Sequence, residues 1–428
     1  MLHNKLEMSD RMYNWAKDLY PLNRSLTGEP NRFTLRYLKN FLPNLQIKSF
    51  KSGEKVFDWI VPQEYQVDEA YVTDSTGNIV IDFSKNNLHL VGYSTDIDSW
   101  MDVNELKKHL HTLPDNPDAI PYLTTYYKKN WGFAISHNDY INLNDSNYHV
   151  VIKSKLFDGE LNYGELILQG SINDEILLST YICHPSMGNN EISGIVVTAA
   201  LAQQLSELSY RRYTYRILFI PETIGSIAYL NSNWQKMKER TKAGFVVTCV
   251  GDTRCYSFMP SRTGETYADK IARFTLDKYI KTYKSYSFLQ RGSDERQYCS
   301  PLIDLPVVSI MRSKYGEYPE YHTSLDNLDL ISSEGLGGSY NIIKTALDII
   351  EKNRIYIPLY FCEPQLGKRG LYNITNKDNP DSILNILAYL DGRNDLVDIC
   401  NIIDIDFFEC QKIVDVLLEN NLIIEKTK

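Results

Sequence analysis

The sequence has little that would cross-link the chain or anchor it in a membrane. Its seven cysteines form no Cys-x-x-Cys pair and follow no regular spacing, which disfavours a disulfide framework and a four-cysteine zinc site. No apolar run approaches the length of a membrane span, and residues 1–15 contain no apolar signal core. These features predict a cytoplasmic protein without a membrane partner.

The chain also has fewer positive than negative charges. Lysine and arginine number 45 against 54 aspartates and glutamates, which gives a net charge of −9 at pH 7. A protein that binds nucleic acid neutralises phosphates with a basic face, so we expect no nucleic-acid partner. The composition is otherwise globular, with 43% hydrophobic residues, and 428 residues suffice for two or three domains.

Apolar spacing predicts helices over residues 9–20 and 27–42 at the start of the chain. From 46 to 160 the pattern changes to short β-rich runs broken by Gly, Asn and Asp, with one helix at "DVNELKKHLHTL". We interpret 46–160 as a smaller β-rich domain, inserted between the two parts of an α/β domain formed by 1–45 and 161–355.

Strands alternate with helices from residue 161, as in "EILLSTYIC" followed by "SGIVVTAALAQQLSEL". Such alternation predicts a mainly parallel sheet flanked by helices. Three short helices and a strand in 356–428 have the outline of a winged helix. Residues 381–428 contain ten acidic and four basic residues, a net of −6, which favours packing or a protein partner, or a homo-oligomer, over DNA.

Polar residues follow the strands of the α/β domain. His184 and Glu191 follow one strand, Glu222 follows the next, and Asp294 and His322 lie near the end of the domain. Ligand sites of such sheets lie beyond the carboxyl ends of the strands, so these loops are expected to converge. Imidazole and carboxylate are ligands that zinc prefers.

Each of these residues also has an ordinary explanation. A histidine that ends a strand is commonly structural, Glu222 can favour the N-terminus of the helix after it, and Asp326 can cap the next segment. The aromatic segment 122–140, which contains His137, is either a lid over the site or the core of its own domain. The joint placement of the loops favours the metal site.

The loops "HPSMGNNEISG", "ILFIPETIGS", "GSDERQY" and "PEYHTSLDN", together with "YPLNRSLTG" near the N-terminus, resemble the zinc aminopeptidase superfamily. This superfamily includes bacterial leucyl aminopeptidases and glutaminyl cyclases. The fuller resemblance is to bacterial aminopeptidase-like proteins that have an inserted β-rich domain and a C-terminal winged helix, and that are often associated with surface-polysaccharide genes.

The resemblance implies a role for each matching position. His184 and His322 match metal ligands, and Tyr321 matches a residue that helps to stabilise the tetrahedral intermediate in some relatives. Glu222 matches a pair of glutamates, one a ligand and one the general base. Asp294 matches a carboxylate that orients the substrate or the ligands. Arg24, in the N-terminal motif, either contacts the substrate or is structural.

The sequence departs from the two-zinc pattern in several places. Asn190 replaces a bridging aspartate, and Glu191 beside it is the alternative ligand. Thr248 occupies the place of another aspartate, with Asp252 the nearest alternative, and only one glutamate occurs in "PETIGS". An amide does not balance two dications as a carboxylate does, so these departures favour a single zinc ion.

The leading hypothesis is therefore a zinc-dependent amide hydrolase. Its substrate would be a small amine-bearing or glycan-linked molecule, as the association with polysaccharide genes implies. The alternative is a catalytically inactive scaffold that binds a ligand and recruits a partner through the winged helix. Transcriptional regulation is a third hypothesis, which the acidic C-terminal domain disfavours.

Overall fold

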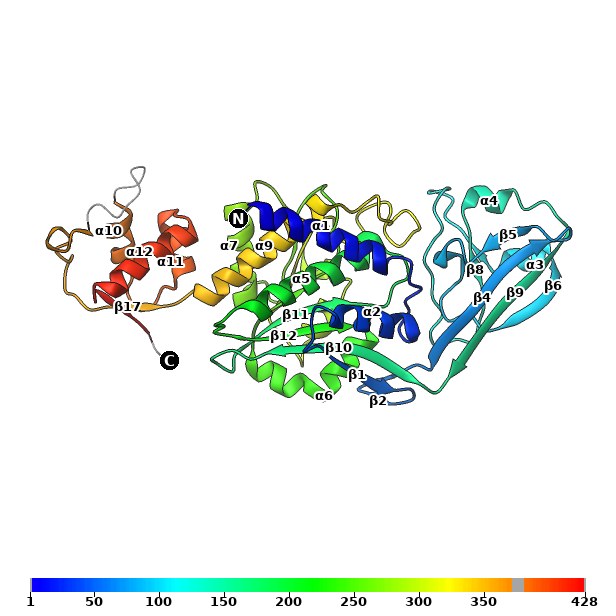
Figure 1. The fold of residues 1–428 in the computed structure, drawn as a ribbon, viewed down its shortest axis with the longest axis horizontal. Coiled ribbons are helices and arrows are strands. Elements are labelled where there is room, and N and C mark those ends of the chain that lie inside the picture. Colours follow the sequence, from blue (N-terminus) through cyan, green and yellow to red (C-terminus); the bar gives the residue numbers. More distant parts are fainter. Residues whose placement is uncertain (1, 372–380, 427–428) are drawn as a thin grey trace. The chain divides into compact units, whose positions relative to one another are not determined.

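The computed structural model of the protein describes residues 2–371 and 381–426, and of residues 2–6 only the backbone (Figure 1). The chain forms two compact units. The first comprises Met1–Asp269 and Thr282–Asn341, and the second comprises Lys270–Lys281 and Ile342–Lys428. The domain boundaries expected at residues 46, 160 and 356 remain predictions.

An eight-stranded sheet forms the centre of the first unit. Its order is β1 (Gln46–Lys51), β10 (Glu160–Leu168), β12 (Thr214–Ile220), β11 (Glu175–Tyr181), β13 (Thr241–Val246), β16 (Val307–Met311), β14 (Ser257–Met259) and β15 (Lys284–Ser285). The central strands β12, β11, β13 and β16 run parallel. Antiparallel pairs flank them, with β1–β10 and β10–β12 on one side and β16–β14 on the other. Every residue of β11 and β12 is buried, as expected of parallel strands covered on both faces.

Helices cover the sheet and confirm the expected α/β class. They include α1 (Leu2–Leu19), α2 (Glu29–Lys39), α5 (Ser193–Glu207), α6 (Ile224–Arg240) and α8 (Glu295–Tyr298). Helix α5 packs on β11 and β12, α1 packs on α5, and α2 packs on β10. Leu177 and Leu218 share an apolar cluster with Ile227 of α6 and Tyr298 of α8. Helices α7 (Tyr267–Tyr279) and α9 (Ser333–Lys352) each have residues in both units.

The inserted β-rich part is built on a second, antiparallel sheet. Its order is β5 (Ile79–Asp82), β4 (Glu64–Asp74), β9 (Asn147–Phe157) and β6 (Ile97–Asp102). Val72, Phe133 and Val150 belong to a separate apolar cluster. The predicted helix is α3 (Val103–Lys108), whose first amides bond to the Asp102 side chain. Short elements complete this part: β2 (Lys55–Val56), β3 (Trp59–Ile60), β7 (Leu110–His111), β8 (Phe133–Ala134) and α4 (His137–Ile141).

The end of the chain has the predicted winged-helix outline. It contains α10 (Ser382–Tyr389), α11 (Leu396–Ile403) and α12 (Phe407–Glu419), and β18 (Ile423–Glu425) pairs antiparallel with β17 (Tyr356–Pro358). Across the described residues, none of the helices combines the length and the apolar character that a membrane span requires. All seven cysteines are free thiols.

Candidate active site

The two histidines that are 138 positions apart in the chain lie side by side. His184 follows β11 and His322 lies in the loop after β16, yet their ring centroids are 5.3 Å apart. Both loops leave the carboxyl ends of parallel strands of one sheet, β11 and β16, which are separated only by β13, and this is why they meet. Glu222, which follows β12, places its Oε2 3.7 Å from His184 Nε2.

The orientation of His184 is fixed by Glu191. His184 Nδ1 lies 2.8 Å from Glu191 Oε2, so the other ring nitrogen, Nε2, faces Glu222. Burial lowers the pKa of His184, but the hydrogen bond to Glu191 and the negative charges of Glu191 and Glu222 together outweigh burial, so the pKa lies above its ordinary value. A carboxylate behind one ring nitrogen is the arrangement that orients metal-binding histidines in proteins.

Glu191 is fully buried and both of its oxygens accept hydrogen bonds. Oε1 accepts from Arg24 Nε at 2.8 Å, and Oε2 accepts from the backbone amides of Cys183 and His184 at 2.7 and 2.6 Å. Cys183, His184 and Glu191 place their ligand atoms within 4.8 Å of one another. These bonds nevertheless put Glu191 behind His184, where it positions the imidazole and is compensated by Arg24.

Asn190 points away from Glu191, although the two residues are adjacent in the π-helical turn η2 (Gly188–Ile192). Its Nδ2 donates to the Tyr181 hydroxyl at 3.1 Å, whereas its Oδ1 is buried and has no partner among the described residues. Asp326 holds this turn, because its carboxylate accepts from the amides of Asn189 and Asn190 at 2.5 and 3.0 Å. Burial raises the pKa of Asp326 to about 6.

Thr248, which occupies the place of the second expected aspartate, and Asp252, the nearest alternative ligand, both have their side-chain oxygens engaged in hydrogen bonds. The Thr248 hydroxyl bonds to the Tyr181 hydroxyl and donates to the Asn190 carbonyl oxygen at 2.7 Å. The carboxylate of Asp252, which is buried, accepts from the Ser313 amide and hydroxyl and from the Asn189 side chain. The geometry therefore gives no support for a second metal position at these residues.

Asp294 supports the turn that presents Glu222. Thr223 has φ 62° and ψ −82°, a conformation that is costly for a β-branched residue. Asp294 Oδ1 accepts from the Thr223 amide at 2.8 Å and from the Ser226 hydroxyl at 2.9 Å. Asp294 is fully buried, and burial raises its pKa to about 7. It thus lies behind Glu222.

Backbone strain is concentrated around these loops. Four residues other than glycine have positive φ there: Ser186 (42°), Thr223 (62°), Cys249 (52°) and His322 (55°). They follow β11, β12, β13 and β16, the four central parallel strands. Strained residues tend to cluster at functional sites, where the surrounding structure holds them.

His322 is half-buried, with its Nε2 atom shielded from solvent. Burial lowers its pKa to about 3, and its Nε2 has no hydrogen-bond partner within the described chain. The ring of Tyr321 stacks on it with the centroids 3.9 Å apart. Tyr122 donates its amide to the His322 carbonyl oxygen at 2.9 Å, and its ring centroid lies 5.2 Å from the centroid of each histidine ring.

A pocket of about 350 Å³ opens onto these groups. It is lined by Leu26, Trp59, Tyr122, Thr124, Tyr126, Tyr127, Cys183, His184, Glu222, Thr223, Ile224, Arg296 and His322. The inserted part contributes Trp59 and the tyrosines, so the beginning of the segment 122–140 covers the site. His137 does not, because it bonds to Thr112 in its own domain.

The predicted residues fall into two groups. His184, Glu222 and His322 line the pocket, whereas Arg24, Asn190, Glu191, Asp294 and Tyr321 stand around it without lining it. Sequence reasoning missed Arg296, whose Nη2 donates to the Thr223 hydroxyl at 2.7 Å and lies 3.8 Å from Glu222 Oε1. Its position in "GSDERQY", two residues after Asp294, could have drawn attention to it.

The donors around the pocket are of the types that zinc binds, although the compact group of possible ligand atoms among the described residues is Cys183, His184 and Glu191, without His322 or Glu222. Two buried acceptors, His322 Nε2 and Asn190 Oδ1, have no partner among the described residues; Asn190 follows β11 as His184 does, and His322 lies in the loop after β16. A buried acceptor left without a donor is costly unless a ligand satisfies it. Histidine nitrogens with an oxygen donor are the set used by catalytic zinc sites.

Comparison with known proteins agrees with this fold. The family described as "Domain of unknown function (DUF4910)" matches residues 13–353, and a winged helix-turn-helix family matches 354–425. A Clostridium acetobutylicum protein is 44% identical over 99% of this chain and 98% of its own length. Its name is "Putative polysaccharide biosynthesis protein with aminopeptidase-like domain".

Solved structures extend the likeness. The crystal structure of a "putative peptidase" from Clostridium acetobutylicum matches with TM-score 0.94 and 42% identity, covering 99% of this chain and 98% of that one. A zinc aminopeptidase from Bacillus subtilis matches with TM-score 0.59 and 12% identity, covering 80% and 94%. An M28 peptidase precursor from Shewanella amazonensis gives 0.57 and 10%, covering 85% and 99%. The last two show a shared fold.

Proposed function

Because this chain belongs to the family described as domain of unknown function DUF4910, followed by a winged helix-turn-helix domain, and has the aminopeptidase fold, we propose that it is a zinc-dependent amide hydrolase. One ion per chain is proposed. The observation that carries the proposal is the convergence of His184, Glu222 and His322 on one pocket. A bound zinc ion would supply Lewis-acid polarisation of the substrate carbonyl.

In this proposal His184 and His322 hold the ion through their Nε2 atoms. Glu191 fixes the ring of His184, and the partnerless Oδ1 of Asn190 is the proposed oxygen ligand. Glu222 is then free to accept a proton from the attacking water. Burial raises the pKa of Glu222 while His184 and Arg296 lower it, and the net shift is upward, as suits a general base.

The pocket supports a small substrate with a polar group beside the amide. Its tyrosines and Trp59 supply a mostly aromatic wall, and Arg296 and Glu222 place opposite charges at its base. The name of the Clostridium acetobutylicum relative, which mentions polysaccharide biosynthesis, supports a glycan-linked or amine-bearing amide as the substrate class.

Metal analysis tests the proposal directly. Protein purified without chelators is expected to contain one zinc ion per chain, as measured by inductively coupled plasma mass spectrometry. His184→Ala and His322→Ala should lose it. Glu222→Gln should keep it but lose hydrolysis of an aminoacyl-amide panel. The matched control is His137→Ala, which removes a histidine bonded to Thr112 outside the pocket.

The competing function is an inactive scaffold that binds a ligand without hydrolysing it. It is favoured by the presence of Asn190 and Thr248 at two positions where a carboxylate ligand is expected. Absence of zinc from the wild-type protein, together with no hydrolysis across the panel, would support the scaffold. Zinc retained by the double variant of His184 and His322 would show that the ion binds elsewhere.

A further inference from the structure

A second, larger cavity is lined by residues of the "NRS" segment, 23–25, and is distinct from the candidate active site. It has a volume of about 520 Å³, within the range of about 300–1,000 Å³ that is usual for ligand pockets. Asn23 and Ser25 line it, whereas the side chain of Arg24 between them is buried against Glu191. Neighbouring residues of one segment therefore line this cavity and hold Glu191 behind His184.

The two cavities are adjacent but not continuous. A void of about 20 Å³ lies between them, lined by Asn23 and Ser25 on one side and by Tyr122 and Thr124, which also line the active-site pocket, on the other. A space of this size holds about one water molecule. None of the candidate metal residues lines the larger cavity.

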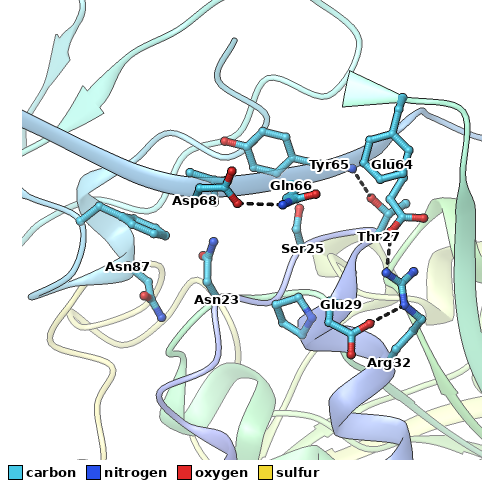
Figure 2. A pocket seen from close by; sticks show the side chains of 14 residues that line it. Asn23, Ser25, Thr27, Glu29, Arg32, Glu64, Tyr65, Gln66, Asp68 and Asn87 are labelled. Atoms are coloured by element: carbon cyan, nitrogen blue, oxygen red, sulfur yellow. Dashed lines mark hydrogen bonds and ion pairs between the residues drawn. The ribbon is translucent and has the colours of Figure 1, made fainter. Parts of the chain in front are cut away.

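Uncommitted polar groups face the interior of the cavity. Figure 2 shows Asn23 and Ser25 from the N-terminal loop opposite Gln66 and Asp68 of β4. The Asn23 amide and the Ser25 hydroxyl make no hydrogen bond to any described residue, and the Asp68 carboxylate accepts only from Gln66 Nε2, at 2.7 Å. Amides and hydroxyls both donate and accept, as a ligand rich in hydroxyl groups requires.

Charge disfavours an anionic ligand here. Arg32 is the cation among the lining residues, and it is already bound to Glu29 at 2.8 Å and to Glu64 at 2.7 Å. Asp68 adds a carboxylate that no lysine or arginine of the described chain neutralises. A phosphate or carboxylate group would therefore meet net negative charge.

Aromatic side chains complete the lining. Phe83 and Phe157 border the same cavity, and Phe157 is 39% exposed. Aromatic rings offer flat apolar surfaces against which the C–H face of a sugar ring packs, while its hydroxyls reach the polar groups opposite. We propose that this cavity binds a neutral saccharide unit, a site distinct from the candidate active site and independent of the proposed hydrolase activity.

Titration calorimetry on the full-length protein tests the proposal, with maltose and N,N′-diacetylchitobiose as neutral probes. At least one of the two is expected to bind. Asp68→Ala should weaken that binding about tenfold or more, since a hydrogen bond to a charged group is lost, and Asn23→Ala should weaken it about threefold, since the lost hydrogen bond is between neutral groups. Asp96→Ala, which removes an exposed aspartate elsewhere in the inserted part, should leave the affinity unchanged.

Two further measurements locate the site and its class. Binding should persist in His184→Ala and in the presence of EDTA, which separates this site from the metal-dependent one. Glucuronic acid and trialanine should bind more weakly than the neutral sugars. Failure of both disaccharides to bind, unchanged affinity in Asp68→Ala and Asn23→Ala, or a preference for glucuronic acid or the peptide would overturn the proposal.

Discussion

Replacing Arg24 by methionine is expected to destabilise the first unit strongly. Arg24 and Glu191 form an ion pair in which both side chains are fully buried, with Nε and Oε1 2.8 Å apart. Arg24 Nη1 also donates to the Leu19 carbonyl oxygen at 2.6 Å. Methionine has a similar shape but supplies neither the charge nor the donors, so Glu191 would keep a buried charge without a cation.

The magnitude follows from that isolated charge. Removing one partner of a buried ion pair costs about 3–5 kcal/mol, a large part of the free energy of unfolding of an ordinary domain, which is about 5–15 kcal/mol. Loss of the Arg24 charge should also loosen the loop around His184, because the same carboxylate binds the amides of Cys183 and His184.

Urea unfolding followed by tryptophan fluorescence measures this loss. All five tryptophans, at positions 15, 59, 100, 131 and 234, lie in the first unit, so the signal reports on the unit that contains the pair. The double variant with Glu191→Gln should lose less stability than the sum of the two single variants, because neither charge is left alone.

Arg36→Met is the matched control. Arg36 pairs with Glu29 on the surface, where their side chains are 51% and 61% exposed, and such pairs contribute about 0–1 kcal/mol. If Arg24→Met lost no more stability than this control, the claim that Arg24 compensates a buried Glu191 carboxylate would be refuted.

Two further predictions concern stability. Burial raises the pKa of Glu165, but hydrogen bonds from Lys48 and Tyr229 and the positive charges of Lys48 and Arg216 together outweigh burial, so the folded pKa lies below its ordinary value. The stability that this shift contributes is present above the unfolded pKa of about 4.3 and is lost as the pH falls through the folded pKa. Urea unfolding should therefore show a smaller loss between pH 6 and pH 3 for Glu165→Gln than for the wild type, and equal losses would contradict the assignment. Gly335→Ala would place its Cβ 1.9 Å from the Gly251 carbonyl oxygen. The overpacking should lower the free energy of unfolding by about 1–3 kcal/mol or more. Gly92→Ala, whose Cβ would meet Thr124 Cγ2 at 3.3 Å, should cost less, and the opposite order in thermal unfolding would count against the packing argument.

The sequence predicted the fold well because its signals are local. Alternating apolar strands and amphipathic helices require a sheet covered by helices, and this class is confirmed, as are the inserted β-rich part and the C-terminal winged helix. The antiparallel flanks were not predicted, since the direction of β1 and β10 depends on which strands they pair with. Pairing partners are set by tertiary contacts.

The candidate site divides in the same way. His184, Glu222 and His322 could be selected from the sequence, because parallel strands deliver their following loops to one edge of the sheet. The functions of Asn190 and Glu191 could not be separated, because a π-helical turn decides which of two adjacent side chains faces Arg24.

The sequence by itself determined the order of the elements, the acidic charge and the loops that carry the chemistry, since these depend on neighbouring residues alone. Only the tertiary structure brought Tyr122 of the inserted part onto His322, paired Arg24 with Glu191 and opened a second cavity between the N-terminal loop and β4. The reason is physical: contacts between residues more than a hundred positions apart depend on how whole layers pack, and side-chain direction within a turn follows from that packing.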